Sequence, residues 1–94
     1  MKTVFITGAS SGIGKETAKL FQAKGWNVVA TMRNPQAEKE FIEQKNIKVL
    51  QCDVTDHNSI KTAVDEGIKT FGDIDVLVNN AGLYNKTARN DLGR

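Results

Sequence analysis

Short apolar runs alternate with longer amphipathic runs along this 94-residue chain, and the alternation limits the folds that it can adopt. Strands are expected where apolar and β-branched residues follow one another, at residues 3–7, 27–31, 48–51 and 75–78. Helices are expected between them, at about residues 12–24, 36–44 and 56–71. Strands and helices in this order form right-handed crossovers between parallel strands. The chain is therefore expected to form an α/β fold, a doubly wound parallel sheet with helices on both faces.

Residues typical of helix ends support this division. Gly25 is placed to end the first helix, Asn34 followed by Pro35 to begin the second, and Thr55 or Asp56 to cap the third. The side chains expected to face the sheet are Ile13, Thr17, Leu20 and Phe21 in the first helix, Phe41 in the second, and Ile60, Val64 and Ile68 in the third.

Composition and charge narrow the class of protein. With 39% hydrophobic and 26% charged residues, and no run of about 18 apolar residues, the sequence is typical of one small soluble domain, expected in the cytoplasm. The formal charge of +2 comes from cations scattered among acids, so neither nucleic acid nor a membrane is an expected partner. Cys52 is the only cysteine and His57 the only histidine, so no metal site is expected.

The glycine-rich segment Thr7-Gly8-Ala9-Ser10-Ser11-Gly12-Ile13-Gly14 falls between the first expected strand and the first expected helix. Glycines at such a turn allow a tight bend, a close approach of the backbone to a pyrophosphate, and packing of the helix on the strand. A tight turn needs glycine whether or not a ligand binds there, so this segment taken alone leaves a purely structural role open.

Three separated motifs carry a resemblance to a known family. They are Thr7-Gly8-x-x-x-Gly12-x-Gly14, Asp53-Val54 after the third strand, and Asn79-Asn80-Ala81-Gly82 after the fourth. In this order they resemble the short-chain dehydrogenases/reductases. The resemblance implies a truncated Rossmann-type sheet with strand order 3-2-1-4, in which residues 1–82 form an NADP-binding half-domain and residues 83–94 a polar C-terminal tail. It also implies hydride transfer between a nicotinamide cofactor and a carbonyl or alcohol.

The same resemblance implies which residues contact the cofactor. Those expected at the pyrophosphate and the adjoining ribose are Gly8, Ser10, Ser11, Gly12, Ile13 and Gly14. Asp53 is expected to accept a hydrogen bond from the adenine amino group, with Val54 against the ring. Asn80, Ala81 and Gly82 are expected to border the ribose on the nicotinamide side. For Asp53 the alternative is an N-cap or loop acid before the third helix.

The end of the second strand favours NADP over NAD as the cofactor. An NAD-preferring enzyme places an acid there for the ribose 2′-hydroxyl, whereas this chain has Arg33, whose planar guanidinium suits a 2′-phosphate. Many NADP-preferring members of the family also carry a cation just before the second glycine, where this chain has Ser11. The alternative for Arg33 is a solvated loop cation.

The family's catalytic Tyr-x-x-x-Lys pair and upstream serine are absent from these residues. The only tyrosine is Tyr84, and Ala88 stands where the lysine is required. Since family members are more than twice this length, the chain is expected to represent their N-terminal, cofactor-binding part, with no catalytic residue of its own. The alternatives are an NADP-binding module without chemistry and a small α/β scaffold that binds weakly or not at all.

The resemblance implies a strand order of 3-2-1-4 followed by further strands, in which the fourth strand is central and one of its neighbours is absent from this chain. Residues 75–78 would be flanked on one side only, and neither lysine nor proline interrupts that strand. The isolated chain is therefore expected to self-associate through its fourth strand.

Overall fold

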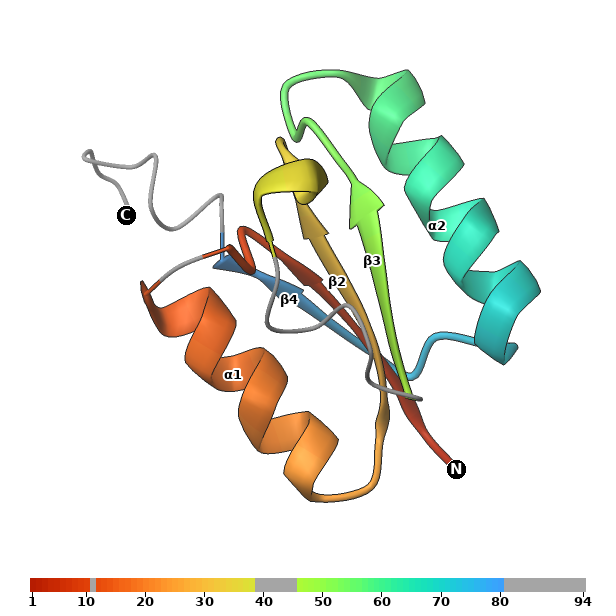
Figure 1. The fold of residues 1–94 in the computed structure, drawn as a ribbon. Helices are drawn as coiled ribbons and strands as arrows, with labels where there is room; N and C mark the ends of the chain where they lie inside the picture. The colour runs from red at the N-terminus through yellow and green to blue at the C-terminus, as the bar shows by residue number, and fades with distance from the viewer. Residues whose placement is uncertain (11, 39–45, 81–94) are drawn as a thin grey trace, which may run out of the picture.

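The computed structural model describes residues 1–10, 12–38 and 46–80 of the chain. Four parallel strands form one sheet in the order β3-β2-β1-β4 (Figure 1), which confirms the expected fold class and strand order. The elements in chain order are β1 (Thr3–Thr7), α1 (Gly12–Ala23), β2 (Asn27–Met32), the 3-10 turn η1 (Pro35–Ala37), β3 (Ile47–Gln51), α2 (His57–Phe71) and β4 (Val76–Asn79).

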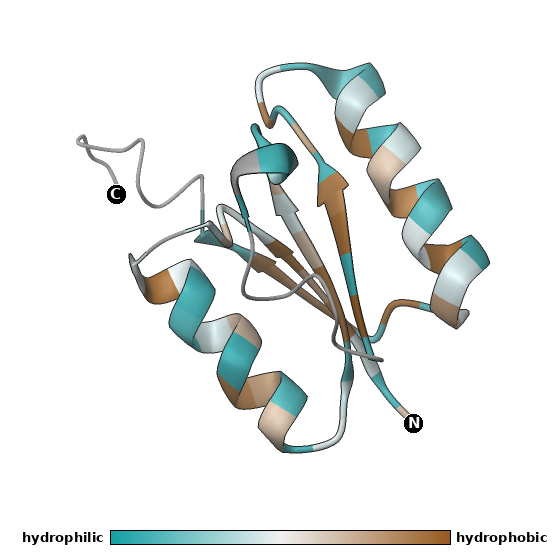
Figure 2. Ribbon diagram, in the orientation of Figure 1, coloured by the Kyte–Doolittle hydropathy of each residue, from teal (hydrophilic) through white to brown (hydrophobic). Residues whose placement is uncertain are grey.

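The sheet lies between α1 on one face and α2 on the other, so its central strands are apolar on both sides (Figures 1 and 2). All five residues of β1 are buried. Val4 and Ile6 belong to a cluster that includes Ala18 of α1, whereas Phe5 belongs to a cluster that includes Ala63 of α2. Alternate residues of one strand thus contribute to two separate cores.

The C-terminal end of α1 and the N-terminal end of α2 are formed by the residues that the sequence predicts. Gly25, at φ 87°, follows the end of α1 and adopts a conformation that favours glycine. At the start of α2 the Asp56 carboxylate accepts hydrogen bonds from the backbone N–H groups of Asn58 at 2.9 Å and Ser59 at 3.4 Å. A cap of this kind stabilises a helix by about 1 kcal/mol.

The inner faces of the helices agree with the prediction only in part. Phe21 of α1 and Ile60 and Val64 of α2 pack against the core as predicted. Ile13 is 75% exposed and Leu20 56% exposed, while Gly14 and Ala18 are the buried residues of α1. The predicted inward position of Ile68 is likewise wrong, because it is 41% exposed. The helices approach the sheet closely along their smallest residues, which leaves the longer side chains to one side of the contact.

The segment after β2 also differs from the prediction. A short helix was expected at about residues 36–44, but η1 ends at Ala37. The next residue, Glu38, has a φ of −87° and a ψ of 129°, which are those of extended backbone. Asn34 makes no capping hydrogen bond through its side chain, and the backbone bond from Glu38 N–H to the Pro35 carbonyl closes the turn. Residues 39–45, including Phe41, lie outside the described residues.

Candidate functional site

The residues singled out in the sequence gather where the four parallel strands end. Gly8 follows β1, Arg33 follows β2, Asp53 follows β3, and Asn80 follows β4. Because the strands are parallel, these four positions share the carboxyl edge of the sheet. In open sheets of this kind, the crevice at the carboxyl ends of the strands is where ligands bind.

The glycine-rich turn is held so tightly that one of its glycines has no space for a side chain. A Cβ built on Gly14 would lie 2.0 Å from the carbonyl oxygen of Gly8 and 2.7 Å from Nδ2 of Asn80. Gly8 and Gly12 have φ values of 65° and 59°, in the left-handed region that favours glycine. The turn is also tied to β2, because Ala9 N–H donates to the Thr31 carbonyl at 3.0 Å.

Polar side chains at the end of β4 connect this strand to the turn. Asn80 Nδ2 donates to the carbonyl of Gly8 at 3.1 Å. Thr7 Oγ1 donates to Asn79 Oδ1 at 3.1 Å, and these two residues are also partners in the register of β1 and β4. Asn80 therefore fixes the first residue of the turn relative to the neighbouring strand.

Asp53 is a partly exposed carboxylate at the end of β3. Its Oδ1 accepts hydrogen bonds from the hydroxyl of Thr55 at 2.7 Å and from the backbone N–H of Thr55 at 3.0 Å. These bonds, the hydroxyl first, lower the pKa of Asp53 below its ordinary value, and the positive charge of Arg33 makes a smaller contribution in the same direction. Since Asp56 caps α2, Asp53 is not the N-cap of that helix.

Val54 contributes to the α2 side of the core. It is partly buried and packs against the cluster that contains Phe5 and Val29. Its backbone thus holds the carboxylate of Asp53 next to a well-packed part of the sheet.

Arg33 directly follows β2 and is exposed. Its carbonyl accepts a hydrogen bond from Nε2 of Gln51 at 3.4 Å, and Cys52 N–H donates to the Met32 carbonyl at 2.9 Å. These contacts hold the ends of β2 and β3 together, so that Arg33 and Asp53 extend from neighbouring strands.

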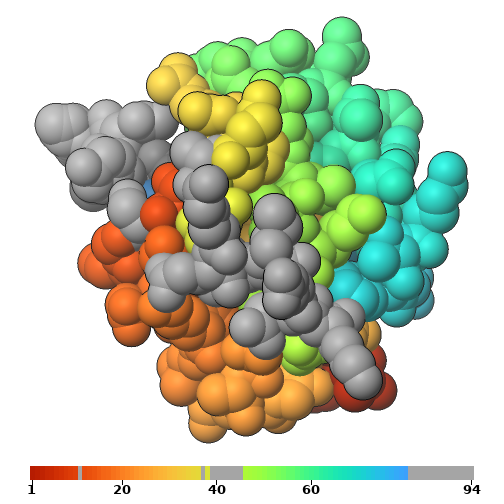
Figure 3. Space-filling view, viewed as in Figure 1, coloured from red at the N-terminus to blue at the C-terminus, as the bar shows by residue number. Residues whose placement is uncertain are grey.

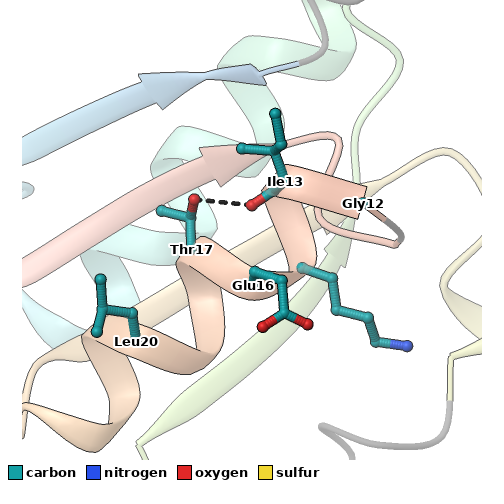
Figure 4. A pocket seen from close by; sticks show the side chains of 6 residues that line it. Gly12, Ile13, Glu16, Thr17 and Leu20 are labelled. Atoms are coloured by element: carbon teal, nitrogen blue, oxygen red, sulfur yellow. Dashed lines mark hydrogen bonds between the residues drawn. The ribbon is translucent and has the colours of Figure 1, made fainter.

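Ile13 lies beside the turn but faces away from the core. With Glu16, Thr17 and Leu20 it lines an open groove of about 470 Å³ along the outer face of α1 (Figure 4). The Thr17 hydroxyl donates to the carbonyl of Ile13 at 2.7 Å, so this hydroxyl is satisfied within the helix. Ile13 and Leu20 supply the apolar part of the groove, and the charged residues Lys15 and Glu16 also line it.

Three of the residues predicted for the site, Ser11, Ala81 and Gly82, lie outside the described residues. Sequence reasoning missed two contacts of the site: the bonds from Thr55 to Asp53, and an ion pair between Lys15 and Glu38. The first could have been found from the Asp-x-Thr spacing, which is typical of a side-chain turn. No feature of the sequence predicts the ion pair between Lys15 and Glu38.

Other candidate chemistry is not supported in the described ranges. Burial is the main cause of a raised pKa for the Cys52 thiol, which is 3% exposed and therefore unsuited to nucleophilic attack. Residues 1–10, 12–38 and 46–80 contain no cluster of three or more His, Cys, Asp or Glu side chains that could bind a metal ion. None of the helices in these ranges is long and apolar enough to cross a membrane.

Comparison with known proteins identifies the family. The family model described as short chain dehydrogenase matches residues 2–93. Secoisolariciresinol dehydrogenase from Forsythia intermedia is 39% identical over an alignment covering 87% of this chain and 31% of the relative. Hydroxysteroid dehydrogenase-like protein 2 from Xenopus tropicalis is 41% identical over 90% of this chain and 23% of the relative. This chain belongs to the short-chain dehydrogenase family, a family of oxidoreductases.

Solved structures agree with this assignment. A short-chain dehydrogenase from Streptomyces avermitilis superimposes with a TM-score of 0.78 and 33% identity, over 84% of this chain and 30% of that chain. Hydroxysteroid dehydrogenase from Escherichia coli gives a TM-score of 0.77 and 32% identity, over 83% of this chain and 35% of that chain. The chain thus spans about a third or less of the length of these relatives.

Proposed function

We propose that this chain binds NADP(H) at the carboxyl edge of its sheet and forms the cofactor-binding part of an oxidoreductase. The observation that carries the proposal is the close contact at Gly14, where the first turn of α1 lies against the Gly8 carbonyl. Because this position has no space for a side chain, the start of α1 lies directly next to the end of the buried strand β1. That arrangement directs backbone N–H groups toward a pyrophosphate.

The residues of the turn fit such a ligand. Gly8 and Gly12 lack side chains where the backbone must approach the phosphates, and α1 has twelve residues, enough for a helix dipole that favours an anion at its N-terminus. The residues assigned to the pyrophosphate and adjoining ribose are Gly8, Ser10, Ser11, Gly12, Ile13 and Gly14.

The two ends of the cofactor are assigned to the neighbouring strand ends. Asp53, which stays ionised at neutral pH, would accept a hydrogen bond from the adenine amino group, with Val54 beside the ring. Arg33 would bind the 2′-phosphate that distinguishes NADP from NAD. Asn80, with Ala81 and Gly82, would border the ribose on the nicotinamide side.

When bound, the nicotinamide would supply or accept a hydride in the reduction of a carbonyl or the oxidation of an alcohol. The chain's own residues bind and orient the cofactor, and no Tyr-x-x-x-Lys pair is present among its 94 residues to move the proton. We therefore expect the isolated chain to bind cofactor without turnover. An assay of NADPH oxidation with a panel of carbonyl compounds tests this, and steady turnover by the isolated chain would contradict it.

Replacing Asp53 with alanine is expected to weaken the binding of NADPH and the binding of NADH by the same factor, about 10-fold, because both cofactors carry the adenine. Titration calorimetry with each cofactor measures the two affinities. Thr55→Val is the matched control, since it removes the 2.7 Å bond to Asp53 but leaves the carboxylate in place. Loss of affinity for one cofactor only would contradict the assignment of Asp53 to adenine.

The lowered pKa of Asp53 predicts how its contribution to cofactor binding varies with pH. Because the folded pKa of Asp53 is lowered, its carboxylate stays ionised as the pH falls from neutral to about 5. Its contributions to cofactor binding and to stability are thus present above the unfolded pKa and are lost as the pH falls through the folded pKa. We expect the ratio of wild-type to Asp53→Ala affinity to be constant between about pH 5 and pH 8.

We also propose that the isolated chain self-associates through β4. Among the described residues this strand is at the edge of the sheet and has a partner only in β1, and Leu77 on it is 63% exposed. Leu77→Lys is expected to convert a dimer at tens of micromolar into a monomer, measured by sedimentation. Leu20→Lys, at a 56% exposed position on α1, is the matched control. A wild-type chain that is already a stable monomer would contradict the proposal.

A further inference from the structure

Glu38 is a buried acid at the far end of the segment that begins with Arg33. Only 6% of Glu38 is exposed, and it is the one charged residue that is buried within the described ranges. Its Oε1 lies 3.3 Å from Nζ of Lys15, whose side chain is 22% exposed. A buried carboxylate is costly without compensating partners, and the ammonium group of Lys15 is one group that stabilises Glu38 in this place.

Lys15 makes this contact from the first turn of α1. It directly follows Gly14, which is held against the Gly8 carbonyl with no space for a Cβ. The ammonium group therefore extends from a backbone that has little freedom to shift. The ion pair links the glycine-rich turn to the segment after β2.

Residues 33–36 lie at the surface, where Figure 3 shows this part of the chain in yellow beside the green chain of β3. The carbonyl of Arg33 holds one end of it through Gln51. At the other end, η1 is closed by the backbone bond between Glu38 and Pro35, and no capping bond from the Asn34 side chain supports it. The ion pair with Lys15 is a charged contact that joins this end to α1.

We infer that the ion pair between Lys15 and Glu38 positions Arg33 and so sets the preference for a cofactor with a 2′-phosphate. The inference rests on the proposed function. Arg33 is exposed, so packing does not fix the direction of its side chain, and the place of its guanidinium depends on the backbone that carries it. Bidentate binding of a phosphate requires a defined orientation of the guanidinium plane. Lys15 and Glu38 act as positioning residues.

Titration calorimetry with NADPH and with NADH tests the inference. Lys15→Met is expected to raise the Kd for NADPH about 5- to 10-fold and the Kd for NADH less than about twofold. Lys15→Arg retains a cation opposite Glu38 and is expected to stay within about twofold of wild type for both cofactors. Lys61→Met is the matched control, because it removes an ion pair with Asp65 whose side chains are 76% and 66% exposed. It should change neither affinity.

A second experiment introduces Lys15→Met into the Arg33→Ala variant. Because Lys15 acts through Arg33, we expect no further loss of NADPH affinity there. A similar loss in both backgrounds, or an equal loss of NADH affinity, would overturn the positioning role. Failure of the proposed function gives a different result: either the wild-type chain binds neither cofactor, or Arg33→Ala alone weakens both equally.

Lys15→Met removes a charged partner of the buried Glu38 carboxylate and is expected to destabilise the fold. The double variant Lys15→Met with Glu38→Gln has no buried charge there, and we expect it to remain folded and to lose NADPH preference to the same extent. Wild-type preference for NADPH in this folded double variant would overturn the inference.

Discussion

Replacing Gly14 with alanine is expected to lower the free energy of unfolding by about 3 kcal/mol and to abolish saturable cofactor binding. The added Cβ would lie 2.0 Å from a backbone carbonyl oxygen, so the start of α1 must move away from the end of β1. For a chain of this size the loss corresponds to a fall in melting temperature of about 15 °C. Thermal unfolding followed by circular dichroism, together with titration calorimetry, measures both effects.

Two other glycines provide graded controls for that variant. Gly25→Ala adds a Cβ in open space and tests only the positive φ of 87°, with an expected cost of about 1 kcal/mol. Gly67→Ala places a Cβ 3.1 Å from a methyl group of Val29, which has some freedom to shift. Stability for Gly14→Ala equal to that of Gly25→Ala would show that the contact with Gly8 is not restrictive.

Replacing Arg33 with alanine is expected to weaken NADPH binding about 30-fold while changing NADH binding less than about twofold. Only NADPH has the 2′-phosphate that the guanidinium would bind, and no acid among the residues that directly follow β2, 33–37, is placed to favour NADH instead. Arg33→Lys retains the charge without the planar fork, so we expect an intermediate loss of NADPH affinity. Titration calorimetry with both cofactors measures the ratio.

An exposed cation far from the strand ends serves as the control for Arg33. Lys61→Ala changes the net charge by the same amount on the surface of α2, and we expect both affinities to stay within about twofold of wild type. Equal weakening of NADPH and NADH by Arg33→Ala would remove Arg33 from the choice of cofactor.

The strand pattern and the helix ends were predictable because they depend on local chemistry. The continuous apolar run of β1 required burial on both faces, and the structure buries all five residues. Gly25 and Asp56 serve at helix ends as their residue types predict. The gathering of Gly8, Asp53 and Asn80 at one edge follows from parallel strands alone.

The faces of the helices were only partly predictable from apolar spacing, which correctly placed Phe21, Ile60 and Val64 against the core. Side-chain size decided the rest, since α1 approaches the sheet through Gly14 and Ala18 and leaves Ile13 exposed. The pairing of Lys15 with Glu38 depends on how the segment after β2 folds back toward α1, which is a tertiary contact without a local signal. Composition and spacing carry no information on such contacts.

Calorimetric titration of the unaltered chain with NADPH and NADH tests whether the carboxyl edge of this sheet binds a nicotinamide dinucleotide, as we propose. We expect saturable binding of one cofactor per chain, with NADPH bound at least about 10-fold more tightly than NADH because of Arg33. A chain that is folded by circular dichroism and yet gives no saturable binding with either cofactor would overturn the proposal.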